Sequence, residues 1–219
     1  MPNVSPPAPS ASDYSGLRLA VLASGSGTIL ESILATDLPV VLVAVDRRCR
    51  ALEVAARAGV DRVLVDRAAF GGFGPTFDRP GYTQQLTDVL VDAKIDVVAM
   101  AGFGTVLGEA VHAAFPDRIL NTHPALLPAF PGWHAVADAL AAGVTETGTT
   151  VHLATVEMDA GPILASAPVP VEPGDTEATL HERIKSVERT LYPETIRVFL
   201  SGLAAGAVAG RGSPREVGG

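Results

Sequence analysis

The sequence has few of the features that mark secreted or membrane proteins. Cysteine is nearly absent: Cys49 is the single one among 219 residues. No internal disulfide can form, and a reducing cytoplasm is the expected location. Long apolar runs are also missing: uncharged apolar stretches such as 97–108 and 160–171 contain Gly or Pro and fall short of the ~20 residues that span a bilayer. We therefore expect a protein that does not enter a membrane.

Basic residues are scarce as well, and the formal net charge is −8 at pH 7. No long basic stripe offsets this charge, so nucleic acid and anionic membranes are not expected partners. An anionic substrate would have to be held by local features. Residues 1–16 are rich in Pro, Ser and Ala and lack the basic start and apolar core of a secretory signal, which predicts a disordered leader. Residues 204–219 are predicted to form a flexible tail.

What the sequence does contain is an alternation of short apolar runs and helical patterns. Apolar runs at 17–23, 40–45, 62–65, 97–100 and 119–120 predict buried strands, and helical spacing between them predicts crossover helices, among them 48–58, 82–93 and 109–114. This order is typical of a wound parallel sheet of the Rossmann-like α/β class. Ligands of such sheets bind at the carboxyl ends of the strands.

The last third of the sequence predicts a different arrangement. After a helix near 134–142, two β-rich segments at 149–154 and 163–171 are too close for a crossover helix and should pair antiparallel. A long amphipathic helix follows, capped by Asp175 and Thr176, kinked or restarted at Pro193 and ended by Gly202. We expect a single α/β domain over 17–203, with a mostly parallel sheet, an antiparallel C-terminal part and a long C-terminal helix.

A glycine-rich turn, Ser24-Gly25-Ser26-Gly27-Thr28, leads from the first predicted strand into a helix. Backbone amides at such a turn favour an anion, so a phosphate site is preferred over a plain structural turn. Asp46 ends the second strand, where the ribose-binding acid of a dinucleotide site would lie. The third glycine of that fingerprint is missing, because position 30 is Leu, and NAD is the weaker alternative.

The segment 121–132 leaves a buried strand and contains three prolines. Asn121 and His123 are two residues apart on an extended chain and point to the same side, so an amide and an imidazole can act on one reacting atom. Their place at a strand end favours a catalytic role. By contrast, the local sequence around Asp159 predicts a solvent-exposed turn residue.

Four other histidines carry weaker signals. His134 and His152 are as consistent with structural roles as with catalytic ones. His112 and His181 are interpreted as residues of helix surfaces.

Two motifs make the sequence recognisable. They are N-x-H-P-x-L-L-P at 121–128, followed by Pro131-Gly132, and D-x-G-P at 159–162. With Gly25-Ser26-Gly27, Ala101-Gly102-Phe103 and Glu188 before Tyr192-Pro193, the chain resembles the formyltetrahydrofolate-dependent transferases over residues 17 to about 200. Within this family it is similar to the branch that formylates phosphoribosylglycinamide in purine synthesis. Related branches carry an additional RNA-binding or regulatory domain.

The resemblance implies an enzyme that uses 10-formyltetrahydrofolate as cosubstrate, without a metal or a covalent intermediate. It makes Asn121, His123 and Asp159 the catalytic residues. The matching positions for the ribonucleotide are Gly27, Thr28, Ile29, Lys185 and Glu188. The matching positions for the folate are Arg79, Gly104, Thr105, Val106, Leu107, Asn121, Thr155, Val156, Glu157, Met158 and Asp159. The sequence departs from the usual family pattern at Ile29, Gly104 and Thr105.

Three alternatives to this function remain open from sequence. A formyltetrahydrofolate hydrolase would use water in place of the amine, but the intact glycine turn and Glu188 favour a transferase. A nicotinamide-dependent oxidoreductase would use Asp46 and would not need Asn121. A non-catalytic folate- or nucleotide-binding protein would not need His123 and Asp159, which are both present. The small-molecule substrates are the expected partners, and the enzyme is expected to be a monomer or a homodimer.

Overall fold

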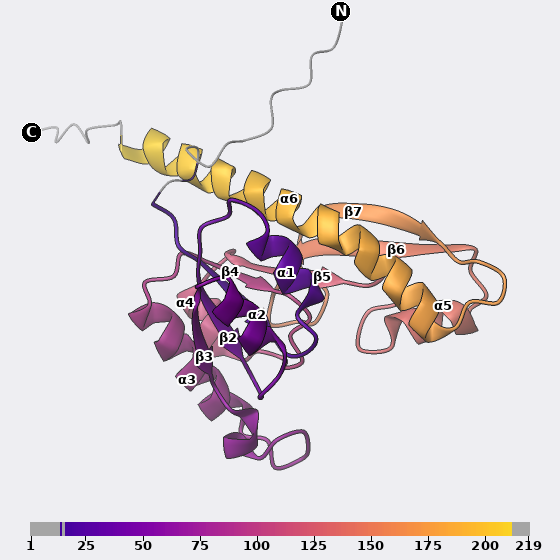
Figure 1. The fold of residues 1–219 in the computed structure, drawn as a ribbon, viewed down its shortest axis with the longest axis horizontal. Helices are drawn as coiled ribbons and strands as arrows, with labels where there is room; N and C mark the ends of the chain where they lie inside the picture. Colours follow the sequence, from indigo (N-terminus) through magenta and orange to yellow (C-terminus); the bar gives the residue numbers. More distant parts are fainter. Residues whose placement is uncertain (1–13, 15, 212–219) are drawn as a thin grey trace, which may run out of the picture.

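The structure is a computed structural model that describes Tyr14 and residues 16–211. These residues form a seven-stranded sheet with the order β3-β2-β1-β4-β5-β6-β7 (Figure 1). The strands are β1 (Leu19–Ala23), β2 (Val40–Val45), β3 (Asp61–Leu64), β4 (Val97–Met100), β5 (Ile119–His123), β6 (Glu146–Leu153) and β7 (Ile163–Pro170). β1 to β5 run parallel, while β6 and β7 are antiparallel to their neighbours. The predicted α/β class and the antiparallel C-terminal part are confirmed.

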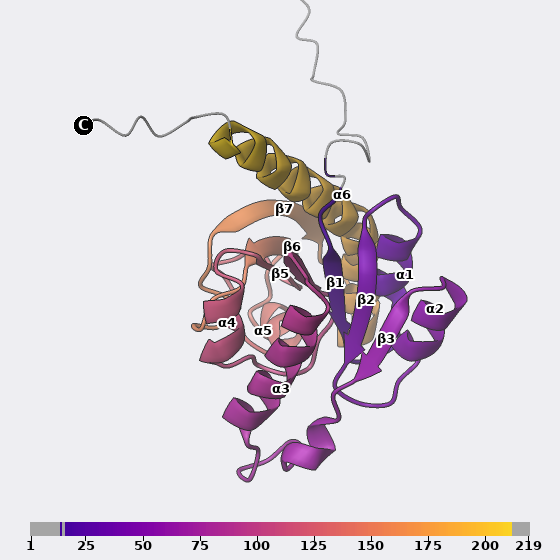
Figure 2. The ribbon, with the colours of Figure 1, turned by 90° about the vertical axis from the view of Figure 1, so that its left-hand side faces the viewer.

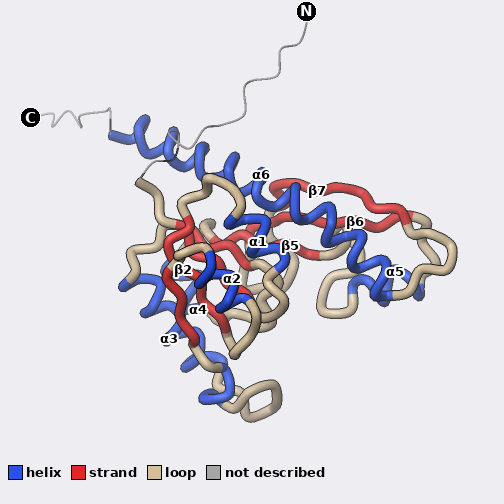
Figure 3. Tube along the Cα trace, in the orientation of Figure 1, coloured by secondary structure: helices blue, strands red, loops and turns tan. Residues whose placement is uncertain are grey.

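Helices cover both faces of the sheet. They are α1 (Thr28–Leu34), α2 (Ala51–Arg57), α3 (Arg79–Asp92), α4 (Glu109–Ala114), α5 (Ala135–Ala141) and α6 (Glu177–Arg211), with a 3₁₀ turn, η2, at Arg67–Phe70. Figure 2 shows β1 to β3 between α1 and α2 on one side and α3 and α4 on the other. In Figure 3 the strands run through the centre with helices around them.

The continuous apolar runs reflect burial on both sheet faces. In β1, Leu19, Val21 and Ala23 belong to the core under α1, α2 and α6. The alternating residues Ala20 and Leu22 belong to the core under α3 and α4. Because successive side chains of a strand point to opposite faces, a central strand needs apolar residues at every position.

The long C-terminal helix α6 lies across α1, β6 and β7 (Figure 1). Its buried residues Leu180, Ile184, Ile196 and Leu200 recur at helical spacing. The expected end at Gly202 is wrong: α6 continues to Arg211, since Gly202 lacks the left-handed φ of a capping glycine. Residues 204–211 of the expected tail are therefore helical, and 212–219 lie outside the described residues. No helix in the described part of the chain is long and apolar enough to cross a membrane.

One residue of the expected leader is part of the core. Tyr14 is 1% exposed and packs in the cluster under α6. Its carbonyl accepts a hydrogen bond from the amide of Leu17 at 3.2 Å. The prediction of disorder is wrong at this residue, because composition averaged over 1–16 conceals a single buried aromatic side chain; residues 1–13 and 15 lie outside the described range.

The outer edge of β7 carries two prolines. The amide of Val171 donates to the carbonyl of Thr145, just before β6. By the alternation of an antiparallel ladder, the backbone nitrogens of Pro168 and Pro170 therefore point away from β6. The carbonyl of Pro170 accepts a hydrogen bond from Arg183 Nη1 of α6 at 3.0 Å.

Candidate active site

A cavity of about 320 Å³ opens at the carboxyl ends of β4 and β5. Its walls come from the loop after β4 (102–107), the end of β5, the loop before α5 and the loop between β6 and β7 (154–159). Loops at this edge of a parallel sheet are the usual place for a ligand site. The cavity contains all three residues predicted to be catalytic, Asn121, His123 and Asp159.

β5 presents its residues to two sides. Asn121 and His123 reach the same group of polar side chains, whereas the hydroxyl of Thr122 between them donates to Glu188 of α6 at 2.9 Å. This alternation is the one predicted from an extended chain. The side chains on the two sides of β5 therefore belong to two different polar clusters.

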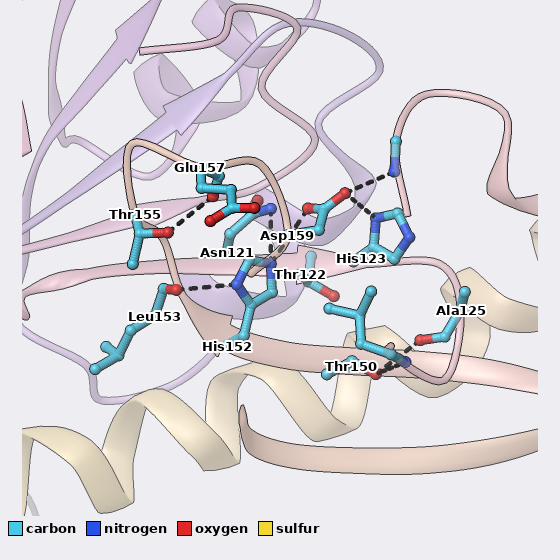
Figure 4. A network of polar contacts seen from close by, with 12 residues as sticks. Asn121, Thr122, His123, Ala125, Thr150, His152, Leu153, Thr155, Glu157 and Asp159 are labelled. Atoms are coloured by element: carbon cyan, nitrogen blue, oxygen red, sulfur yellow. Dashed lines mark hydrogen bonds and ion pairs between the residues drawn. The ribbon is translucent and has the colours of Figure 1, made fainter. Parts of the chain in front are cut away.

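The first cluster centres on Asp159 (Figure 4). His123 Nδ1 lies 3.3 Å from Asp159 Oδ2, and the amide of Gly132 donates to the same oxygen at 2.8 Å. The other ring nitrogen of His123, Nε2, lies 2.8 Å from the Phe130 carbonyl. Both neighbours of the ring accept hydrogen bonds, so the imidazolium form satisfies both contacts. Asp159 itself has φ 55°.

His152 joins this cluster from β6. Its Nε2 lies 3.3 Å from Asn121 Nδ2 and 3.5 Å from Asp159 Oδ1, and its Nδ1 lies 3.0 Å from the Leu153 carbonyl (Figure 4). Nε2 therefore contacts both an amide and a carboxylate oxygen, and it accepts from the Asn121 amide when unprotonated or donates to Asp159 when protonated. The sequence left this residue undecided, because the register that pairs His152 with Asn121 is set by strand pairing between distant segments.

The charge of Asp159 is stabilised by its neighbours. Burial raises the pKa of Asp159, but contacts with His152, the Gly132 amide and the charge of His123 outweigh this effect and hold the pKa below its ordinary value of 3.8. The carboxylate is 6% exposed. It therefore stays ionised beside two imidazoles.

The second cluster lies behind β5 and contains a buried acid. Glu188 is 5% exposed and accepts hydrogen bonds from Thr122 at 2.9 Å and Thr149 at 3.1 Å. Burial raises the pKa of Glu188, against the opposing effects of these hydrogen bonds and of Lys185. Glu188 and Lys185 do not line the cavity, but Thr122 does, so the cluster adjoins it.

Most positions predicted to contact folate line the same cavity. They are Gly104, Thr105, Val106, Leu107, Thr155, Val156 and Met158. Glu157 is not among the lining residues, although its backbone carbonyl accepts from the Thr155 hydroxyl at 2.8 Å. Arg79 lines a second, adjoining cavity of about 320 Å³.

Two histidines interpreted as helix-surface residues also belong to the cavity wall. His112 of α4 and His181 of α6 line it. Burial lowers the pKa of both side chains, with Lys185 adding to the effect at His181. Both side chains are half-buried, so they lie on the helix surfaces that border the cavity. His134, at the start of α5, is exposed and does not line it.

The glycine turn lies at the start of α1. Gly27 has φ 73°, and a Cβ there would approach Ala51 Cα to 3.2 Å, so the turn requires glycine. Ile29 is 6% exposed in the core, which leaves only its backbone for a ligand. Neither cavity reaches Gly27, Thr28 or Ile29.

Asp46 is committed to internal contacts. It is fully buried, accepts from the Thr105 hydroxyl at 2.8 Å and lies 4.0 Å from Arg67 Nη1. A ribose-binding acid would have to reach the ligand. The position of Asp46 therefore argues against the dinucleotide alternative.

Comparison with known proteins identifies relatives of the whole domain. Residues 17–196 match the family described as Formyl transferase. A phosphoribosylglycinamide formyltransferase of Mycobacterium tuberculosis is 51% identical over 179 residues, covering 80% of each chain. The Escherichia coli protein of the same name is 37% identical over 151 residues, covering 69% of this chain and 68% of that protein.

A solved structure agrees with this result. The glycinamide ribonucleotide transformylase 1 of Symbiobacterium toebii superposes with a TM-score of 0.79 at 42% identity, covering 85% of this chain and 88% of that one. The similarity therefore extends from the sequence motifs to the arrangement of the sheet and helices.

Proposed function

Because the chain belongs to the formyl transferase family, we propose that it transfers the formyl group of 10-formyltetrahydrofolate to the amine of phosphoribosylglycinamide. The products are formylglycinamide ribonucleotide and tetrahydrofolate, and the reaction is a step of purine synthesis. The names of the relatives support this substrate. The proposal rests on one observation: Asn121, His123 and Asp159 all line the same cavity.

The reaction requires stabilisation of a developing oxyanion. The amine attacks the formyl carbon, and the formyl oxygen becomes negative in the tetrahedral intermediate. We assign one hydrogen bond to this oxygen to the Asn121 amide, whose orientation is supported by His152 at 3.3 Å. An N–H donor aimed at such an oxygen lowers the barrier most in a site with little water.

His123 supplies the second donor and a proton. The intermediate collapses when the bond between the formyl carbon and N10 breaks, and N10 then gains a proton while the attacking amine loses one. The imidazolium of His123, stabilised by the Asp159 carboxylate at 3.3 Å, is suited to this proton transfer. To reach the substrate, Nε2 has to exchange its contact with the Phe130 carbonyl.

The remaining predicted residues hold the two substrates. Backbone groups of 104–107 and 155–159 are assigned to the pterin edge, and Arg79 to the folate at the second cavity. Amides of 27–29 are assigned to the phosphate, with Lys185 adding positive charge and Glu188 accepting from ribose hydroxyls. Glu188 Oε1 already accepts from two threonines, which orients the carboxyl group for this contact.

The location and assembly of the enzyme are part of the proposal. Small-molecule substrates and a single cysteine are consistent with the cytoplasm. We keep the expectation of a monomer or homodimer. Residues 17–203 are proposed as the catalytic domain.

The test is a formyl-transfer assay with purified protein, 10-formyltetrahydrofolate and phosphoribosylglycinamide. Tetrahydrofolate should form only when the amine is present, and His123→Ala should abolish its formation. Release without the amine would identify a hydrolase. No turnover with both substrates would contradict the proposal.

A further inference from the structure

We propose that Trp133 stacks on the aminobenzoyl ring of the formyl donor and selects donors that carry this ring. The proposal rests on the proposed function and adds a residue to it. Trp133 lies just after Gly132 in the loop between β5 and α5 and is the single tryptophan of the chain.

The exposure of Trp133 has no structural explanation within the fold. Its side chain is 62% exposed, although a tryptophan contributes most to stability when buried. Two further large apolar side chains, Val156 and Met158, are 57% and 42% exposed on the loop between β6 and β7. All three line the catalytic cavity. Exposed apolar side chains gathered at a cavity favour a ligand with an apolar part.

Trp133 stands between the two cavities. Three residues line both: Gly104, Val106 and Trp133. The first cavity contains the catalytic residues, and the second contains Arg67 and Arg79. A ligand that extends from one cavity to the other has to pass Trp133.

The chemical structure of the donor matches this path. N10 carries the formyl group and is bonded directly to the benzoyl ring, so the ring lies two bonds from the formyl carbon. With the formyl group beside Asn121 and His123, the ring reaches the junction of the cavities. The carboxylates beyond the ring then face the exposed Arg79, and the flat ring meets the indole, which favours a stacked or edge contact.

The loop that bears Trp133 is fixed by the catalytic residues. The amide of Gly132 donates to Asp159 Oδ2 at 2.8 Å, and the carbonyl of Phe130 lies 2.8 Å from His123 Nε2. Both residues have positive φ, 92° at Gly132 and 53° at Phe130. When His123 Nε2 turns to the substrate, the Gly132 amide still holds this backbone through Asp159, which lowers the entropy cost of the contact.

The experiment measures binding of two probes by calorimetry to the full chain. One probe is 10-formyl-5,8-dideazafolate, which contains the benzoyl ring; the other is 6-hydroxymethylpterin, which lacks it. Trp133→Ala should weaken binding of the first probe about tenfold, the scale of a lost aromatic contact together with its buried area, and binding of the second less than twofold. Trp133→Phe should restore most of the affinity. Val198→Ala on α6, whose side chain is also 62% exposed, should change neither.

Equal weakening of both probes, or no weakening of either, would overturn the proposal. A transfer assay on the wild type shows whether the role of Trp133 or the proposed function has failed. Transfer to phosphoribosylglycinamide with unchanged probe binding in Trp133→Ala would reject only the role of Trp133. Ring-dependent binding without transfer would reject only the function.

Discussion

His123 and Asp159 meet in the wall of the catalytic cavity, with Nδ1 3.3 Å from Oδ2. The histidine comes from the end of β5 and the aspartate from the loop between β6 and β7. The Gly132 amide shares the same carboxylate oxygen, so three separate segments meet at one atom. The properties of this pair lead to the first predictions.

Asn121→Ala should lower turnover by roughly a hundredfold or more, because it removes one donor to the oxyanion. Steady-state kinetics with both substrates checks this, and circular dichroism should show an unchanged fold. Thr190→Ala, at an exposed position of α6, is the control and should have wild-type turnover. Near-normal turnover of Asn121→Ala would remove the residue from the mechanism.

Asp159→Asn should also lower turnover by at least roughly a hundredfold, since it removes the charge that stabilises the His123 cation. The exposed Asp138→Asn of α5 serves as the matched control. An unchanged rate would contradict the role of Asp159 in supporting His123.

The same substitution should change the acid stability. The pKa of Asp159 is lowered in the folded state, so its contribution is present above the unfolded value of 3.8 and is lost as pH falls through the folded value. Denaturant unfolding should therefore show a steeper loss of stability below about pH 4 for the wild type than for Asp159→Asn. Parallel curves for the two proteins would argue against this assignment.

Glu188→Gln should raise the stability of the protein while it weakens binding of the ribonucleotide. Gln can still accept from Thr122 and Thr149 but carries no charge. The pKa of Glu188 is raised by burial, so in the wild type stability is lost as pH rises from 4.5 through the folded value. The variant should gain stability relative to the wild type over this range, while its KM for the ribonucleotide rises about tenfold through the lost charged hydrogen bond.

Glu194→Gln, an exposed position on the same helix, controls for the change of net charge. It should alter neither the pH dependence nor the KM. A Glu188→Gln variant with an unchanged KM would exclude the ribose contact.

Tyr14→Ala should lower the free energy of unfolding by about 3 kcal/mol, as expected for truncating a buried aromatic side chain. Its ring is 1% exposed in the core under α6, at the amino end of β1 and away from the catalytic edge. Turnover at 25 °C should stay normal. Tyr14→Phe keeps the ring and should retain most of the stability; similar losses in both variants would contradict a packing role.

The sequence predicted the central strands well because their signal is local. β2, β4 and α4 have the predicted bounds, since burial on both faces requires an unbroken apolar run. The pairing of Asn121 with His123 also follows from local geometry, the two-residue repeat of a strand.

Features that depend on distant contacts could not be derived in this way. Asp159 reads as a turn residue until the β6–β7 loop is placed against β5, and only the family motif indicated it. The contact of His152 depends on the register between β5 and β6. Tyr14 and the continuation of α6 past Gly202 depend on packing and on a backbone angle that composition does not reveal.

The prolines on the outer edge of β7 restrict how two copies of this protein can associate. An exposed strand edge can recruit a second sheet through free amide groups. At Pro168 and Pro170 no such amide exists, and the Pro170 carbonyl is occupied by Arg183. Pairing with a strand of a second copy is therefore disfavoured at this end of β7, which leaves the opposite sheet edge at β3, the helices and the loops as surfaces for a homodimer.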